Sequence, residues 1–131
     1  MTWFKKINNV KKYKNESTFY GGNHYDSKAE ANYAVELDLR KKSGDIKDWE
    51  RQINFPIYHK GKLITTPRID FLIHHIDGMK EFVEVKSPMT ASLSDYRIKR
   101  KLIEAELDDD KNFMPYRVEV YKQFYFKKWR S

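Results

Sequence analysis

The apolar positions over residues 27–44 recur at helical spacing, which predicts a first helix. Its apolar positions share one helical face: Ala29, Tyr33, Ala34 and Leu37. Ser27 and Glu30 have the spacing of a capping box, in which each residue satisfies a free backbone N–H group of the other. Gly44 can adopt the left-handed conformation that ends many helices. We therefore expect a helix that begins after Ser27 and ends before Gly44.

Strand-like patterns fill the middle of the chain. Residues 53–67 are rich in β-branched and aromatic side chains but contain Pro56 and a Lys60-Gly61-Lys62 turn, which predicts an edge hairpin or a bent strand. Residues 68–86 hold two strand-like runs separated by Asp77-Gly78, which is typical of a hairpin. This second segment is the most apolar in the chain, so we expect it to be central.

A second helix is predicted over residues 94–107, with Ile98, Leu102 and Ala105 facing inward. A last strand is predicted over residues 116–126. The order of helix, strands, helix and strand indicates an α/β layered domain.

The N-terminal segment has a different character. Residues 1–24 show no sustained period, and the paired glycines Gly21 and Gly22 indicate a turn. We expect residues 1–24 to form a basic, partly flexible arm and residues 25–131 to form one domain.

Composition narrows the possible classes. The 131 residues include no cysteine, which excludes disulfides and thiolate metal sites. The chain has no run of 18 apolar residues and no secretory signal, so we expect a cytoplasmic protein with no membrane partner.

The net charge of +7 is concentrated at the two ends of the chain. Residues 1–16 carry five lysines and one glutamate, and residues 117–131 carry five Lys or Arg and one glutamate. Lysines interleaved with aromatics, as at Lys11 and Lys12 in "VKKYK", suit a nucleic acid, where cations contact phosphates and rings stack on bases. The alternative is a solubilising tail with an ordinary basic edge strand.

Three charged residues in the central hairpin form a site in only one of two registers. A two-residue Asp77-Gly78 loop would place Asp70 opposite Val85 and disperse the charges. A three-residue loop closed by Gly78 would place Asp70 opposite Glu84, with Lys86 on the same face as Glu84. Both loops are compatible with the sequence.

In the second register, two carboxylates about 5 Å apart at Cβ would repel each other unless a cation lay between them. Oxygen ligands without cysteine favour Mg²⁺, with Mn²⁺ as a substitute, rather than zinc. Lys86 could then orient or deprotonate a water and stabilise a pentavalent phosphate. Alternatively, Glu84 and Lys86 lie on an exposed strand face and Asp70 is a polar residue at a strand end.

Several motifs resemble the PD-(D/E)xK nuclease superfamily, in particular small phage-encoded proteins related to Holliday-junction resolvases. They are "SKAE" on the first helix, "RIDF", the later "EVK" and "DYRIKRKL", and they span about residues 20–107. The chain departs from the family pattern where the usual proline-aspartate becomes Ile69-Asp70. The resemblance implies a restriction-endonuclease-like αβββαβ core, with a central mixed sheet flanked by helices.

The resemblance also implies residue roles. Asp70 and Glu84 would bind the metal together with the Val85 carbonyl, and Lys86 would be the catalytic lysine. Glu30 matches an acidic residue that many members use as a further metal contact, although it could equally serve only the helix cap.

Cations crowd the first half of the second helix, where they oppose the helix dipole unless an anion lies nearby. We therefore expect nucleic-acid contacts from Tyr96, Lys99, Arg100 and Lys101 and, in the N-terminal arm, from Lys11 and Lys12.

The expected function is that of a Mg²⁺-dependent endonuclease for branched DNA in phage recombination or replication. It would act as a homodimer in the host bacterial cytoplasm. Two alternatives stay open: an inactive DNA-binding module on the same fold, and a structural protein whose basic ends bind nucleic acid.

Overall fold

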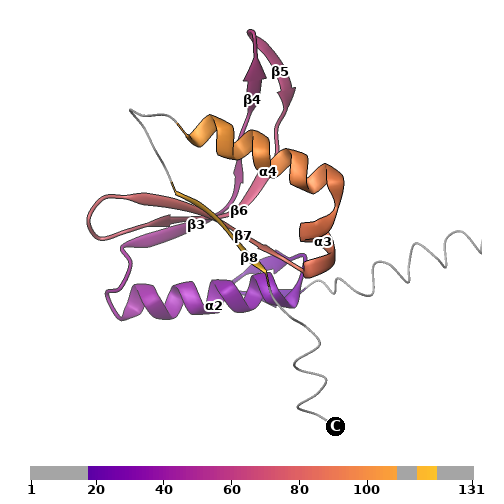
Figure 1. Cartoon of the computed structure of the whole chain (residues 1–131). Helices are drawn as coiled ribbons and strands as arrows, with labels where there is room; N and C mark the ends of the chain where they lie inside the picture. The colour runs from indigo at the N-terminus through magenta and orange to yellow at the C-terminus, as the bar shows by residue number, and fades with distance from the viewer. Residues whose placement is uncertain (1–17, 109–114, 121–131) are drawn as a thin grey trace, which may run out of the picture. The chain divides into compact units, whose positions relative to one another are not determined.

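The structure, a computed structural model, describes residues 18–108 and 115–120 (Figure 1). The chain divides into two compact units, residues 1–39 and 40–131. Within the described residues, no helix is both long enough and apolar enough to cross a membrane.

The first unit contains a short hairpin and most of the first helix. Strands β1 (Thr18–Tyr20) and β2 (Asn23–Tyr25) pair antiparallel. Gly21 and Gly22 connect them with φ of 58° and 83°, so the expected turn is present and is flanked by short strands that the sequence did not indicate. The Tyr20 hydroxyl donates to Asp38 Oδ2 at 2.5 Å, which joins this hairpin to the helix.

Helix α2 (Lys28–Lys42) begins and ends where the sequence predicted. The Ser27 hydroxyl accepts a hydrogen bond from the Glu30 backbone N–H at 3.1 Å. At the other end Gly44 has φ of 81°, and Asp45 N donates to Arg40 O at 2.9 Å, as in a Schellman cap. The buried apolar residues are Ala31, Ala34 and Leu37, whereas Ala29 and Tyr33 are only partly buried.

The second unit is built on a four-stranded mixed sheet in the order β3-β6-β7-β8. Its strands are β3 (Asp48–Asn54), β6 (Arg68–His74), β7 (Lys80–Lys86) and β8 (Tyr116–Val120). The first three pair antiparallel, and β8 pairs parallel with β7. The protein is thus of mixed α/β class. Strand β3 starts five residues before the predicted strand-rich segment because Trp49 is the only apolar residue among its first five, which is too few to show a strand period.

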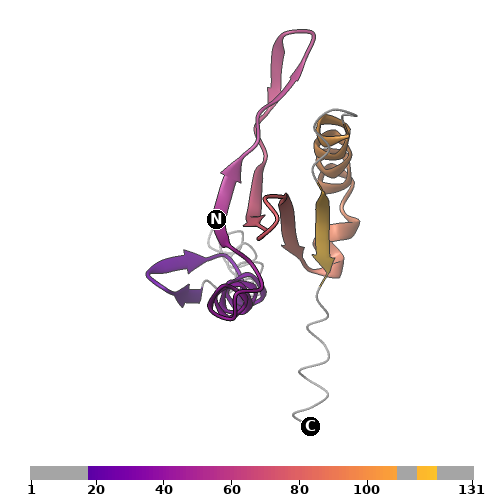
Figure 2. The same cartoon turned by 90° about the vertical axis from the view of Figure 1, so that its left-hand side faces the viewer.

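Helices α3 (Pro88–Ser92) and α4 (Ser94–Leu107) connect β7 to β8. The bounds predicted for α4 are correct, but its predicted inward face is only partly right: Leu102 packs against the core, whereas the other two predicted positions do not. Ile98 is 60% exposed and Ala105 is also exposed, whereas Ile103 and Leu107 are buried. The reason is tertiary: α4 covers the sheet face that bears Leu72 and Phe82, and packing there selects a different helical stripe from the one read along the sequence (Figures 1 and 2).

Strands β4 (Ile57–His59) and β5 (Lys62–Thr65) form a separate two-stranded ribbon between β3 and β6. This is the hairpin expected around Lys60-Gly61, and it projects beyond the end of the four-stranded sheet (Figure 1).

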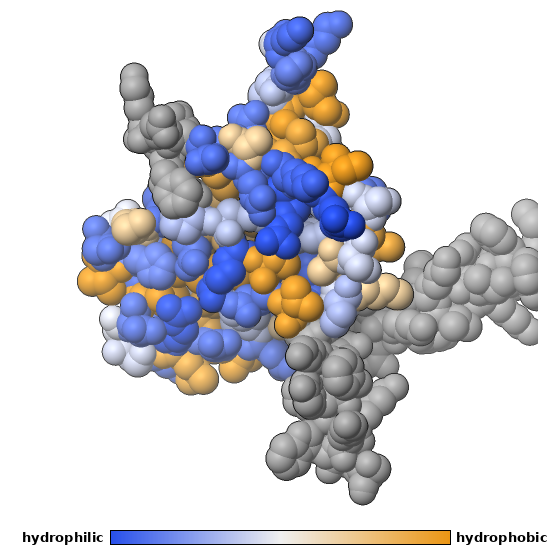
Figure 3. Space-filling view, in the orientation of Figure 1, coloured by the Kyte–Doolittle hydropathy of each residue, from blue (hydrophilic) through white to orange (hydrophobic). Residues whose placement is uncertain are grey.

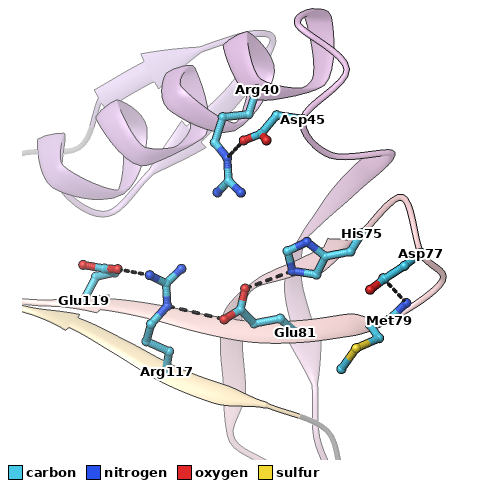
Figure 4. A network of polar contacts seen from close by, with 8 residues as sticks. All are labelled: Arg40, Asp45, His75, Asp77, Met79, Glu81, Arg117 and Glu119. Atoms are coloured by element: carbon cyan, nitrogen blue, oxygen red, sulfur yellow. Dashed lines mark hydrogen bonds and ion pairs between the residues drawn. The ribbon is translucent and has the colours of Figure 1, made fainter.

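A polar network at the other end of the sheet joins β8 to the β6–β7 hairpin (Figure 4). Glu81 lies at its centre, 3.1 Å from His75 Nε2 and 3.5 Å from Arg117 Nε. Arg117 also contacts Glu119 at 2.5 Å. These contacts tie the parallel edge strand to the hairpin on which the candidate site lies.

Candidate functional site

The loop between β6 and β7 decides the hairpin register. His75 N donates to Met79 O at 2.8 Å, and Gly78 N donates to His75 O at 3.1 Å. Gly78 has φ of 91°, a conformation that favours glycine. The loop therefore contains three residues, Ile76, Asp77 and Gly78, and the two-residue alternative is excluded.

The pairing that follows places the two acidic residues on one face of the sheet. Phe71 pairs with Val83, and Leu72 pairs with Phe82. Continuing this register by one step sets Asp70 opposite Glu84, on the same face as Leu72 and Phe82 because side chains alternate.

The regular ladder between β6 and β7 ends at this point. Its last pair is Phe71 with Val83, and the Val85 backbone N–H donates to Asp70 Oδ2 at 2.9 Å. A side-chain carboxylate thus accepts from a strand N–H group, as a partner carbonyl does within a regular ladder. This bond fixes Asp70 against β7.

Lys86 forms an ion pair with Asp70. Its Nζ lies 3.2 Å from Asp70 Oδ2, and the two side chains are only 19% and 12% exposed. The same ammonium lies 5.8 Å from the centroid of the Tyr96 ring. An ion pair shielded to this extent differs from a surface pair, because little water competes for either charge.

Burial raises the pKa of the Asp70 carboxyl above its usual range, and the negative charge of Glu84 raises it further. The positive charge of Lys86 and the N–H group of Val85 oppose this shift. The effect of Glu84 indicates that the two carboxylates are near enough to repel each other, as the three-residue loop predicts.

Glu84 is 4% exposed and accepts two phenolic hydrogen bonds on one oxygen. Tyr96 from α4 donates to its Oε2 at 2.7 Å, and Tyr116 from β8 donates to the same atom. Burial, followed by the charge of Glu84, raises the pKa of both tyrosines well above the usual range. Both phenols therefore stay protonated at neutral pH and can donate hydrogen bonds to Glu84.

Tyr116 was missed by sequence reasoning. It pairs with Phe82 in the parallel β7–β8 ladder, and this register turns its side chain to the face that carries Glu84. No local pattern reveals this partnership, because 32 residues separate Tyr116 from Glu84. Tyr96, expected as a nucleic-acid contact, directs its hydroxyl to Glu84.

The remaining predicted site residues lie in different places. The Val85 side chain is buried on the sheet face opposite Glu84. Glu30 lies in the first unit, in the first turn of α2, and is 9% exposed. Its metal contact stays a prediction, beside the capping role of its backbone N–H.

The cations of α4 are at the surface. Lys99 and Lys101 are exposed, and Arg100 Nε contacts Glu104 at 2.9 Å within the helix. The predicted contacts Lys11 and Lys12 lie outside the described residues.

The donor atoms of the site fit a small hard cation. Mg²⁺ is often held by one or two carboxylates, with waters and substrate phosphates completing its shell, and Asp70 and Glu84 offer such a pair. In the described part of the chain, no group of three or more His, Asp or Glu side chains is placed to hold a metal ion.

A family model described as "Protein of unknown function (DUF1064)" matches residues 10–123. The chain belongs to this family. The match includes every described strand and helix, and with them Asp70, Glu84 and Lys86. No curated protein and no solved structure matches the chain.

Proposed function

We propose that this DUF1064 member is a Mg²⁺-dependent DNA endonuclease that hydrolyses phosphodiester bonds. The observation that carries the proposal is the meeting of Asp70, Glu84 and Lys86 on the β6–β7 hairpin, with Lys86 Nζ 3.2 Å from Asp70. The order α2, β3, β6, β7, α4, β8 also agrees with the αβββαβ core that the PD-(D/E)xK resemblance implies.

The proposed roles follow from the positions of the side chains. Asp70, Glu84 and the Val85 carbonyl would hold Mg²⁺, which supplies Lewis-acid polarisation of the phosphate and lowers the pKa of bound water. Tyr96 and Tyr116 fix the Glu84 carboxylate by their hydroxyl groups. Because both hydroxyls donate to the same oxygen of Glu84, its second carboxylate oxygen is oriented for a different partner.

Lys86 would act on the phosphate. Its ammonium now neutralises Asp70 and would contact the phosphoryl oxygens when substrate is present, where it stabilises the charge of the pentavalent transition state. Water would be the nucleophile: it gives up a proton to solvent as its oxygen forms a P–O bond, and the leaving sugar oxygen takes up a proton as its own bond to phosphorus breaks.

Charge supports DNA as the substrate. The exposed Lys99 and Lys101 on α4, with the lysines of residues 1–16, provide cations for phosphate contacts. Selectivity for branched DNA and a homodimer that cuts two strands are proposed from the resemblance to the resolvase-related family.

Cleavage of a panel of end-labelled DNAs tests this function. The panel contains a four-way junction, a flap and a linear duplex, each incubated with Mg²⁺ or Mn²⁺. We expect the wild type to cut at least one branched substrate. Asp70→Asn should not cut, although its amide oxygen can still accept from Val85 N. Failure of the wild type to cut any substrate, or equal cutting by the variant, would overturn the proposal.

The same pair of proteins separates the two rival functions. An inactive DNA-binding module would bind DNA without cutting it. The substitution Asp70→Asn would then leave any binding of Mg²⁺ unchanged. A metal titration by calorimetry, comparing the wild type with Asp70→Asn, gives this readout independently of cleavage.

A further inference from the structure

The β4–β5 ribbon leaves large apolar side chains in solvent. Tyr58, Leu63 and Ile64 are 56%, 56% and 55% exposed, and only Ile57 at the base is buried. Tyr58 pairs with Leu63 across the two strands. Two-stranded ribbons have little stability of their own, so exposed apolar residues here give no benefit to the isolated fold.

The turn of the ribbon places a lysine in a strained backbone conformation. Lys60 and Gly61 have φ of 51° and 78°, which is the pattern of a type I′ turn. Asn or Gly is strongly favoured at the first of these positions, and a lysine with positive φ is uncommon. A cation thus stands at the turn of the ribbon even though its backbone conformation is unfavourable for a lysine.

The charge of this segment has one sign. Residues 51–69 contain no Asp or Glu, and the cross-strand pair next to the turn is His59 with Lys62. Figure 3 shows the same division, with hydrophilic residues at the tip of the ribbon and hydrophobic side chains below them. The cations at the tip are complementary to a polyanion, and the apolar and aromatic side chains of the two strands suit the groove of such a polymer.

We propose that the β4–β5 ribbon inserts into the major groove of duplex DNA, an inference that rests on the proposed function. The major groove is wide enough to admit a two-stranded β-ribbon. Lys60 and Lys62 contact the flanking phosphates, while the exposed face of Tyr58 and Leu63 lies against the bases. Among the classes of partner, DNA fits the charge of the tip better than a second copy of this basic chain.

The connection from the ribbon to the candidate site supports this placement. Strand β5 leads through Pro67 into β6, where Asp70 is the third residue. Asp70 lies eight positions after Lys62, a stretch that spans at most about 28 Å when extended. One turn of B-DNA is about 34 Å long, so a ribbon in the groove sets the carboxylates beside the same turn of duplex.

The test compares two double variants that each remove two lysines. Lys60→Asn/Lys62→Gln changes the tip, and its Asn-Gly turn relieves the strain, so its melting temperature should equal or exceed that of the wild type. Lys47→Gln/Lys80→Gln is the matched control, because both residues are exposed and lie beside His74 at the opposite end of β6. Affinity for a fluorescent duplex is measured by anisotropy in EDTA over a range of salt concentrations.

We expect the tip variant to lose affinity by at least about tenfold, with a log–log salt slope shallower by about 1.8, because each phosphate contact contributes about 0.9. The control should retain the wild-type slope. Equal slopes for the two variants overturn the inference. A second result would also overturn the inference. If light scattering shows that the wild type is a dimer, and Tyr58→Ser/Leu63→Ser breaks the dimer without changing the affinity for DNA, then the ribbon docks a second copy of the chain.

The outcomes also separate this inference from the proposed function. A wild type that binds duplex through the ribbon but never cuts DNA overturns the endonuclease and leaves the ribbon inference standing. A wild type that cuts DNA while the tip variant binds normally overturns only the ribbon inference. A wild type that binds no DNA overturns both.

Discussion

Glu84 shows how one buried carboxylate depends on its neighbours. It is 4% exposed, and two phenols from different elements donate to one of its oxygens. A buried donor that loses its acceptor costs about 1–3 kcal/mol. The effect of a substitution at Glu84 on folding therefore depends on whether the new side chain can still accept a hydrogen bond.

We predict that Glu84→Ala lowers the free energy of unfolding by about 2–5 kcal/mol, because the hydroxyls of Tyr96 and Tyr116 lose their shared acceptor. Glu84→Gln retains an amide oxygen and should stay within about 1 kcal/mol of the wild type. Both variants should lose cleavage. Urea denaturation measures the difference, and equal destabilisation by the two substitutions would mean that the loss of an acceptor oxygen does not explain the effect of Glu84→Ala.

At the scale of elements, the β6–β7 hairpin depends on the backbone of Gly78. Its φ of 91° lies in the left-handed region, and a Cβ added there would meet no heavy atom within 4 Å. A larger side chain is therefore opposed by backbone strain and not by crowding. The same residue sets the register that brings Asp70 opposite Glu84.

We predict that Gly78→Ala lowers the free energy of unfolding by about 1–2 kcal/mol, the usual penalty for a non-glycine residue in this conformation. Ile76→Ala is the control, since Ile76 lies in the same loop and is 63% exposed. Thermal or urea unfolding gives the comparison. If Gly78→Ala proves as stable as the control, the loop tolerates a side chain there and the register has another determinant.

Local signals account for the elements that the sequence predicted well. Ser27 and Gly44 define α2 because caps act over three to five residues, and the hairpin at residues 68–86 carries its turn within its own sequence. The inward face of α4 was predicted correctly only at Leu102, for the opposite reason. It is set by contact with Leu72 and Phe82, which lie on strands far away in the chain.

At the scale of the whole molecule, charge is distributed unevenly. Residues 1–16 carry five lysines and one glutamate, so their removal takes away a net charge of +4 out of +7. Under the proposed function these residues add affinity without forming the site. Under the rival in which the basic ends bind nucleic acid by themselves, they are essential.

We predict that deletion of residues 1–16 weakens duplex binding and reduces its salt dependence but does not abolish binding, because the cations of α4 and of the ribbon remain. Fluorescence anisotropy at several salt concentrations measures both effects. Complete loss of binding, with an unchanged melting temperature, would favour the structural protein with basic ends.

The sequence by itself determined the bounds of α2 and α4 and the turn of the central hairpin, since caps, turns and periods are short-range properties. It left two loops open between β6 and β7, and only the folded hairpin selected the one that sets Asp70 opposite Glu84. The role of Tyr116 in the site could be identified only from the tertiary structure. Its contact with Glu84 spans 32 residues and exists because β8 pairs parallel to β7, a long-range choice that no local pattern records.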